Sequence, residues 1–339
     1  MLYLSIPTQV ELDNYYESII KKIDRVIHGI VHSAEIKAFL TSDRIKGVIQ
    51  DEPAALLNHH KEAMMSLVAN FNNAEYDTYI AVRNKQIKNA AESFLINRYG
   101  IVEQLFSVFN YAGFISGSKS TAYKLAAKLN RNTCTYCNRL YTQTITTGGE
   151  GTGGNNDSER IIRPEFDHWF PKYKYPLLAL SYYNLIPSCS VCNTSVKIRA
   201  DFTLDTHTHP YIKEAGQEFT FSYHNESVHE NNVRIKVQKP SKTATTLMDF
   251  RTEKIYNVHS NLELKDLLEL KCNYSKNYLE ILLKKTFDSL EISEKEAYRL
   301  IFGVQKDEDD FHKRPLSKFK TDIIAELMEI DKKATLLNG

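Results

Sequence analysis

The chain has 339 residues, of which 42% are hydrophobic and 25% charged, as in ordinary globular proteins. This length can support about two or three domains, and no apolar run approaches the roughly 18 residues of a membrane span. The first 16 residues lack a basic segment, so we expect no secretory signal. Because 43 Lys and Arg oppose 42 Asp and Glu, a nucleic-acid partner would have to be attracted by a local basic patch.

Residues 9–130 are predicted to form consecutive helices. Apolar positions recur at three- and four-residue spacing in residues 15–31, 54–71 and 79–96. A further helix is expected over about residues 121–129, leading into the first cysteine pair. A Gly-rich insert follows at residues 146–158 and lacks the Gly-Lys-Ser/Thr ending of a P-loop. We therefore predict a solvated hairpin loop there.

The rest of the chain is predicted to be mixed. Alternating residues indicate a short strand within 161–170 and two more strands at 218–224 and 232–239. Helical spacing returns in three final segments, at residues 262–287, 294–304 and 316–330. We expect a mainly α protein with a small α+β centre. Its expected divisions are a helical region 1–125, a central region 126–215 and a mixed region 216–339.

The cysteines give the first specific chemical signal. Two C-x-x-C pairs account for four of the five: Cys134, Cys137, Cys189 and Cys192. Two such turns supply the tetrahedral sulfur shell that zinc prefers, and four thiolates leave no open position, so the predicted zinc is structural. The alternatives are two unrelated pairs of buried cysteines or a redox motif, which would need a βαβ unit. The fifth, Cys272, is expected to be a small core residue.

An odd number of cysteines without an export signal favours reduced thiols in the cytoplasm over a disulfide framework.

A second pattern lies between and after the cysteine pairs. It consists of Asp-His-x-x-Pro at residues 167–171 and Asn-Leu-x-x-x-Cys-x-x-Cys-Asn-x-x-x-Lys at residues 184–197. This order resembles the signature of HNH (ββα-metal) endonucleases over about residues 131–200. It departs from many members at Asn193, where they carry His, and this puts the metal preference in doubt.

The resemblance implies that a β-hairpin and a following helix enclose one divalent metal ion. Asp167 and Asn193 would be its protein ligands. His168 would be the general base, and Asn184 would hold the hairpin loop. Oxygen ligands suit Mg²⁺ or Mn²⁺, and a neutral imidazole that deprotonates water contributes roughly 10²–10⁴-fold. The expected products carry 5′-phosphate and 3′-hydroxyl ends.

Each of these residues also has an ordinary alternative, such as a hydrogen-bonded Asp–His pair or an Asn that caps a helix. Three basic residues near the proposed site are candidates to contact the substrate phosphate: Lys197, Lys172 and Arg139. Solvated surface charge is the alternative for Lys172 and Arg139, whereas Lys197 is favoured because it lies four residues after Asn193, on the same helix face. The basic stretch 312–320 could bind a nucleic-acid backbone or simply begin the last helix. His207 and His209 lack a partner at ligand spacing, so no second metal site is expected there.

The sequence pattern of residues 167–193 is also similar to that of the HNH nucleases of Septu-type bacterial anti-phage systems, which work beside an ABC-like ATPase. That resemblance implies an ATPase partner, with residues 1–125 as the docking surface. Three functions remain: a nuclease that acts in phage defence, a zinc-ordered nucleic-acid-binding module that does not cut, and a protein scaffold. For the nuclease, the HNH resemblance favours DNA over RNA as the substrate. The near-neutral charge favours the scaffold over the binding module, whereas the set of Asp167, His168 and Asn193 favours the nuclease over both.

Overall fold

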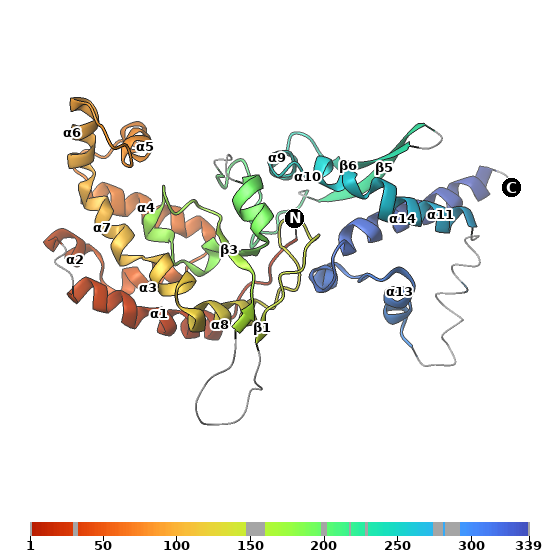
Figure 1. The fold of residues 1–339 in the computed structure, drawn as a ribbon, viewed down its shortest axis with the longest axis horizontal. Helices are drawn as coiled ribbons and strands as arrows, with labels where there is room; N and C mark the ends of the chain where they lie inside the picture. The colour runs from red at the N-terminus through yellow and green to blue at the C-terminus, as the bar shows by residue number, and fades with distance from the viewer. Residues whose placement is uncertain are drawn as a thin grey trace, which may run out of the picture.

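The computed structural model describes residues 2–29, 33–146, 160–197, 202–216, 218–227, 230–273, 281 and 292–337. This part of the chain is mainly helical and contains three two-stranded antiparallel sheets, which confirms the predicted composition of the fold (Figure 1). Nearly all of the Gly-rich insert, and most of residues 274–287 of the predicted long helix, lie outside the described residues. Among the described helices, none has the length and apolar character needed to cross a membrane.

The helical front gathers at one end of the molecule (Figure 1). Its elements are α1 (Gln9–Gly29), α2 (Ala34–Phe39), α3 (Ser42–Gln50), α4 (Pro53–Leu67), α5 (Asn73–Val82), α6 (Ala90–Arg98), α7 (Gly100–Val108), the π-helical turn η1 (Ala112–Ser116) and α8 (Lys119–Leu129). In α1 the buried Ile19, Ile23 and Ile27 repeat every four residues, so one stripe of the helix faces the core. The predicted consecutive helices are confirmed.

The prediction of one helix over residues 79–96 is wrong, because α5 ends at Val82 and α6 begins at Ala90. Asn89 starts α6 with a capping box: its side chain accepts a hydrogen bond from the backbone of Glu92, and the Glu92 carboxylate accepts one from the backbone of Asn89. These bonds satisfy backbone donors that a continuous helix would have used internally. The apolar spacing spans the break because both helices pack on the same core.

The centre contains short strands and turns. They are β1 (Ile145–Thr146), β2 (Arg160–Ile162), β3 (Glu165–His168), the 3-10 turns η2 (Pro176–Leu178) and η3 (Tyr182–Asn184), β4 (Leu185–Ser188) and the π-helical turn η4 (Val191–Val196). The predicted strand at 161–170 is therefore two strands that join different sheets, since β2 pairs with β1 and β3 pairs with β4. Pro164 separates them because it has no backbone N–H for a ladder.

The C-terminal region contains the predicted hairpin and helices. Its elements are β5 (Phe219–Ser227), β6 (Glu230–Val237), α9 (Lys242–Asp249), α10 (Thr252–Tyr256), the short turns η6 (Asn257–His259) and η7 (Ser260–Leu264), α11 (Lys265–Asn273), α13 (Glu294–Phe302), η9 (Glu308–Lys313) and α14 (Ser317–Leu337). Strands β5 and β6 pair antiparallel, with Phe221 opposite Ile235. The strand predictions at 218–224 and 232–239 and the last two helix predictions are confirmed.

Two hydrophobic clusters organise these elements. One contains buried residues from Leu4 to Tyr211 together with Phe250, and so includes both the helical front and the centre; the other extends from Phe219 to Leu327. Polar contacts also join front and centre, as where the Tyr15 hydroxyl donates to the carbonyl of Leu180 at 2.9 Å. The helical front is thus part of the packing that holds the central strands in place.

Acid is expected to destabilise the helical front through His60, on α4. Its Nδ1 is buried without a partner among the described residues, and its ring lies edge-on to Tyr175 at 4.8 Å. Burial lowers the pKa of His60 to about 3. Below pH 6.5 the unfolded chain therefore binds a proton that the folded chain does not, and stability falls by about 1.4 kcal/mol per pH unit down to about pH 3.

Urea unfolding at pH 7 and pH 5 tests this expectation. Between these pH values, wild type should lose roughly 2 kcal/mol more than a His60→Phe variant, which cannot titrate. An exposed control, His28→Asn, should keep the wild-type pH dependence. Equal pH dependence in wild type and His60→Phe would refute the role of His60.

Candidate active site and metal centre

The candidate active site is built on the β3–β4 pair and the helical turn that follows it. The strands are antiparallel with Asp167 opposite Ile186 and His168 opposite Leu185, and η4 starts three residues after β4 ends. The register is regular, so side chains alternate between the two faces of β3. The side chains of Asp167 and His168, which are adjacent in sequence, therefore point to opposite faces of β3.

Asp167 is buried, with 5% of its surface exposed. Its Oδ2 accepts hydrogen bonds from the Tyr136 hydroxyl and from the Lys197 ammonium, each at 2.5 Å. Both bonds end on the same oxygen, so Oδ1 retains its lone pairs. Tyr136 lies between Cys134 and Cys137, and the cysteine turn therefore directly orients the Asp167 carboxylate.

His168 is also buried, and its Nε2 lies 3.0 Å from the carbonyl oxygen of Ala179. Because a carbonyl can only accept, Nε2 carries the hydrogen and Nδ1 keeps the free lone pair. The ring lies edge-on to Tyr111, with centroids 4.4 Å apart. Burial, together with the positive charges of Lys172 and Lys197, lowers the pKa of His168 to about 3. The imidazole is therefore neutral at pH 7 and can accept a proton.

Asn184 joins the segment after β3 to the turn before β4. Its side chain is fully buried and makes three hydrogen bonds. The amide oxygen accepts from the backbone N of Phe170 at 2.7 Å, and Nδ2 donates to the carbonyls of Phe170 at 3.1 Å and Leu178 at 2.9 Å. Its own carbonyl accepts from the backbone N of Trp169. The residue thus fixes the loop that begins immediately after His168.

Replacing Asn184 with alanine is expected to lower the free energy of unfolding by about 3 kcal/mol, because it leaves several buried backbone groups without partners. Chemical denaturation measures this loss. Asn97→Ala, at an exposed position on α6, is the control and should change stability by less than about 0.5 kcal/mol. Similar stabilities for the two variants would show that the Asn184 bonds contribute little.

Asn193 approaches β3 from η4. Its Nδ2 donates to Oε2 of Glu165 at 2.8 Å, which leaves the amide oxygen available for another contact. Glu165 was not among the predicted site residues. Strand periodicity could have found it, because residues 165 and 167 are two apart on β3 and share a face. The structure thus places a second carboxylate beside Asn193 and on the same strand face as Asp167.

A pocket of about 400 Å³ brings most of the predicted residues together. Five of the predicted residues line it: Asp167, His168, Lys172, Asn193 and Lys197. Glu165, Arg163 and Tyr111 also line it and were not predicted. Asn184 lies behind the pocket and does not line it.

The predicted basic residues occupy different environments. Lys197 is buried with 7% exposed, and its ammonium donates to Oδ2 of Asp167 and to two backbone carbonyls at the end of β3. Burial lowers its pKa. These bonds fix the strand end, and a substrate contact for Lys197 stays a prediction. Lys172 is more open, with its ammonium 4.9 Å from the centre of the Tyr111 ring at the pocket wall.

Arg139 does not line this pocket. Its Nε donates to Nε2 of His259 at 2.9 Å, in the C-terminal region. In the basic stretch 312–320, Lys313 and Lys318 form ion pairs with Asp310 and Asp322.

His207 contacts Asp249 at 2.9 Å, whereas His209 is buried against the ring of Trp169.

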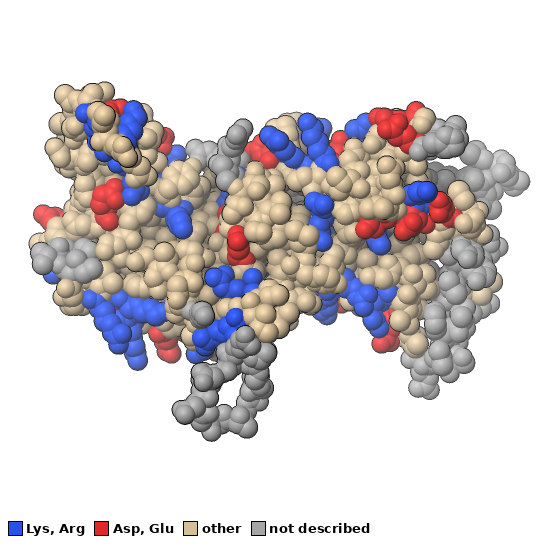
Figure 2. Space-filling model, viewed as in Figure 1, with Lys and Arg blue, Asp and Glu red and all other residues tan. Residues whose placement is uncertain are grey.

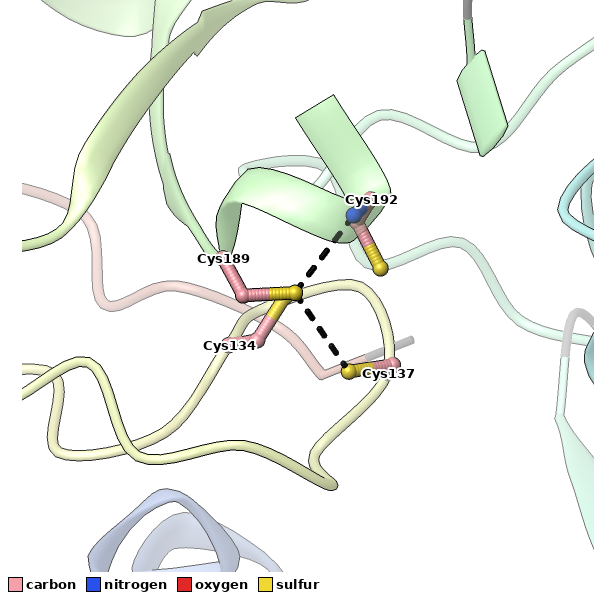
Figure 3. A group of neighbouring side chains, drawn as sticks. All are labelled: Cys134, Cys137, Cys189 and Cys192. Carbon is pink, nitrogen blue, oxygen red and sulfur yellow. Dashed lines mark hydrogen bonds between the residues drawn. The ribbon is translucent and has the colours of Figure 1, made fainter. Parts of the chain in front are cut away.

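The four cysteines of the two C-x-x-C pairs converge from the loop after α8 and from the segment between β4 and the first turn of η4 (Figure 3). Their sulfur atoms all lie within 4.8 Å of one another, and those of Cys137 and Cys189 are 4.0 Å apart. A tetrahedral zinc ion with Zn–S bonds of about 2.3 Å would place its sulfurs about 3.8 Å apart. Backbone N–H groups of Arg139 and Cys192 point to the sulfurs of Cys137 and Cys189. The cluster could therefore hold a metal ion such as zinc.

The first cysteine turn is also tied to the C-terminal region. Asn138 adopts a left-handed conformation with φ of 49°, which Asn tolerates better than most residues. Its Nδ2 donates to the carbonyls of Phe311 and Arg314, and its backbone carbonyl accepts from Leu316. The turn is therefore held by bonds that cross more than 170 positions of sequence.

The prediction that Cys272 is a core residue is wrong, because this side chain is exposed. On α11 the buried residue is Leu267. Residue 272 lies five positions later, which turns it about 140° away from that buried side.

Comparison with known proteins gives no relative: no family model, curated protein or solved structure matches the chain.

Proposed function

We propose that this chain is a metal-dependent endonuclease of the HNH type that hydrolyses phosphodiester bonds, with DNA as its substrate. The observation that carries the proposal is one pocket that gathers Asp167, His168 and Asn193 from two antiparallel strands and the helical turn after them. The four-cysteine cluster, with zinc as its proposed ion, braces both ends of this unit. A scaffold has no need for a carboxylate, an amide and a neutral imidazole in one pocket.

The oxygen donors of the pocket fit a hard divalent ion. Asp167 Oδ1, the amide oxygen of Asn193 and the carboxylate of Glu165 are the candidate ligands, and oxygen sets of this kind suit Mg²⁺ or Mn²⁺. When bound, such an ion would supply Lewis-acid stabilisation of the phosphate and of the leaving oxygen. The bonds from Tyr136 and Lys197 to Oδ2 hold the Asp167 carboxylate in a fixed orientation for this role.

His168 is the proposed general base. Nδ1 would accept a proton from the attacking water while the water oxygen bonds to phosphorus. The P–O3′ bond would break, and the departing O3′ would take a proton from solvent, which gives a 3′-hydroxyl and a 5′-phosphate. In the free protein the low pKa reflects burial and two nearby lysines. A bound phosphate carries negative charge, which opposes those lysines and raises the basicity of the ring. The substrate itself would thus bring the imidazole closer to the range that general-base catalysis needs.

Local positive charge supports a nucleic-acid substrate despite the net charge of +1. Figure 2 shows Lys and Arg side chains gathered along the lower edge of this face, where α1 and α8 lie in Figure 1. Exposed basic residues on these helices include Lys21, Arg25, Lys124 and Lys128. Arg163 and Lys172 line the pocket itself. A strand of nucleic acid is recognised mainly through its phosphates, which such side chains contact.

The same proposal places the enzyme in bacterial anti-phage defence beside an ABC-like ATPase. The region near α6 supports a docking role for residues 1–125, since Ile87 is 90% exposed and Phe94 is 61% exposed. Deleting the whole region would break the core it shares with the centre. An Ile87→Glu, Phe94→Glu double variant is the better test, and it should lose co-purification with the ATPase while keeping the wild-type unfolding midpoint. Retained co-purification would contradict this docking surface.

The test of the nuclease is plasmid cleavage with Mg²⁺ or Mn²⁺ and without divalent ion, on wild type and Asn193→Ala. Wild type should nick plasmid only with added metal. The variant should cut at least tenfold more slowly at limiting metal and recover partly at high metal, because it loses one ligand. Thr194→Ala, at the exposed neighbouring position, is the control. Absence of metal-dependent cleavage on both DNA and RNA would favour the binding module or the scaffold.

A further inference from the structure

A second cavity, separate from the active-site pocket, has a volume of about 660 Å³. Its wall is formed by residues 2–6 at the start of the chain, by Arg131, by residues around Tyr211 and by parts of β5, η9 and α14. It shares no lining residue with the pocket around His168. Its volume lies in the range of small-molecule binding sites, roughly 300–1,000 Å³.

Arg131 gives this cavity its chemical character. The side chain is 8% exposed, and Nη2 donates to the carbonyl of Tyr3 at 3.0 Å. Nε is buried without a hydrogen-bond partner, and no carboxylate within the described residues forms an ion pair with the guanidinium. Burying a charge without a counterion is costly. The cost would be relieved by an anion that enters from the cavity.

The other cations of the wall are already neutralised. Three lysines line the cavity, and each forms an ion pair: Lys213 with Glu308, Lys306 with Glu294 and Lys318 with Asp322. Among the described residues of the wall, Arg131 is therefore the cation that lacks an acidic partner. Burial lowers its pKa to about 10, so it stays charged at neutral pH.

Tyr211 adds a second unused donor. Its side chain is 6% exposed, and its hydroxyl is buried with no partner among the described residues. The ring itself is held in place, edge-on to Tyr183 at a centroid distance of 4.9 Å. Together with Phe219 and Phe311, it also gives the cavity an aromatic part of its wall. A hydroxyl and a guanidinium at one wall are suited to the oxygens of a carboxylate or a phosphate.

We propose that this cavity binds a small molecule with one carboxylate or phosphate group, anchored by Arg131 and by the Tyr211 hydroxyl, with its apolar body against the aromatic wall. The charge of the wall limits the ligand. Four acidic residues line the cavity against four basic ones: Glu218, Glu308, Asp309 and Asp322. A polyphosphate or a nucleic-acid backbone would be repelled by them, whereas a single anionic group is accommodated. This site is therefore distinct in chemistry from the proposed nuclease pocket.

The experiment uses the full chain and thermal unfolding in chloride, phosphate or benzoate at matched ionic strength. Phosphate or benzoate should raise the wild-type midpoint by about 2–4 °C relative to chloride when present at roughly ten times its Kd. A rise with phosphate alone identifies an organic phosphate as the ligand type, and a rise with benzoate alone identifies a carboxylate. No rise with either anion overturns the proposal.

Variants localise the effect. Arg131→Met keeps the length of the side chain without its charge and should abolish the rise, with at least a tenfold loss of affinity in calorimetric titration. Lys213→Met, at an exposed and already paired cation of the same wall, should keep the rise. Tyr211→Phe removes only the unpartnered hydroxyl, so it should fold and show a reduced rise; it decides the question if Arg131→Met does not fold. An undiminished rise in Arg131→Met, or in Tyr211→Phe where that variant decides, refutes the site, whatever the cleavage assay shows.

Discussion

Replacing His168 with alanine is expected to slow metal-dependent plasmid cleavage by about 10²–10⁴-fold, the usual contribution of a general base. The reason lies in the geometry of the imidazole. The bond from Nε2 to the Ala179 carbonyl fixes the tautomer, and the free Nδ1 belongs to a residue at the pocket wall. Alanine removes the proton acceptor while leaving the proposed oxygen ligands in place. Single-turnover cleavage at saturating Mg²⁺ measures the effect.

Loss of activity must be separated from loss of structure, because His168 also packs against Tyr111. His168→Gln keeps a polar side chain of similar reach and should be as inactive as His168→Ala while remaining closer to wild type in stability. His59→Ala, at a partly exposed histidine outside the pocket, is the control for activity. Cleavage by folded His168→Ala within threefold of the wild-type rate would show that another group deprotonates the water.

Loss of the cysteine-bound metal is expected to have the largest effect on stability. The purified chain should contain about one zinc ion, and Cys192→Ser should lose it. Structural zinc contributes roughly 10–16 kcal/mol to the folding of small metal-bound domains. We therefore expect a loss of more than about 5 kcal/mol in the free energy of unfolding, accompanied by loss of cleavage. Elemental analysis and urea unfolding measure both parts.

The expected loss of cleavage follows from a contact between the cysteine turn and Asp167. Tyr136 lies within the Cys134–Cys137 turn and donates to Oδ2 of Asp167, so release of the metal would free the carboxylate that the proposed mechanism needs fixed. Cys272→Ser is a matched control because Cys272 is exposed and outside the cluster. If Cys192→Ser retained its metal and its wild-type stability, the four cysteines would be buried thiols and not a metal centre.

Much of the fold follows from local signals. Apolar spacing predicts α1, α4 and α14, and alternation predicts β5 and β6. The errors occur where a single residue interrupts a longer pattern. Pro164 divides the predicted strand at 161–170 between two sheets, and the capping box at Asn89 begins a new helix inside an unbroken run of apolar spacing. Pro164 and the capping-box residues are both visible in the sequence. They act on backbone N–H groups, whereas hydrophobic periodicity depends only on which side chains are apolar.

The site is predictable only in part. Sequence order predicts Asp167, His168 and Asn193, which the structure brings to one pocket. It does not predict Tyr136 or the direction of the Lys197 ammonium, because both depend on contacts across about 30 residues of chain. Arg139 is predicted to contact the substrate because it lies near the proposed site in the sequence, yet it does not line the pocket. Its partner is 120 residues away, a contact that no local pattern contains.

The bonds around Asn138 have a practical consequence for anyone seeking a minimal catalytic fragment. Residues 126–215 contain every proposed ligand and the proposed base, and they would be the natural choice to express alone. Yet the backbone that carries Cys134 and Cys137 rests on Phe311, Arg314 and Leu316, and the Tyr256 hydroxyl donates to the carbonyl of Cys137. A chain truncated to residues 126–215 would keep the proposed ligands and the proposed base. It would lose the hydrogen bonds that hold the Cys134–Cys137 turn to the C-terminal region. We therefore expect a stable proposed nuclease to require the C-terminal region as well as residues 126–215.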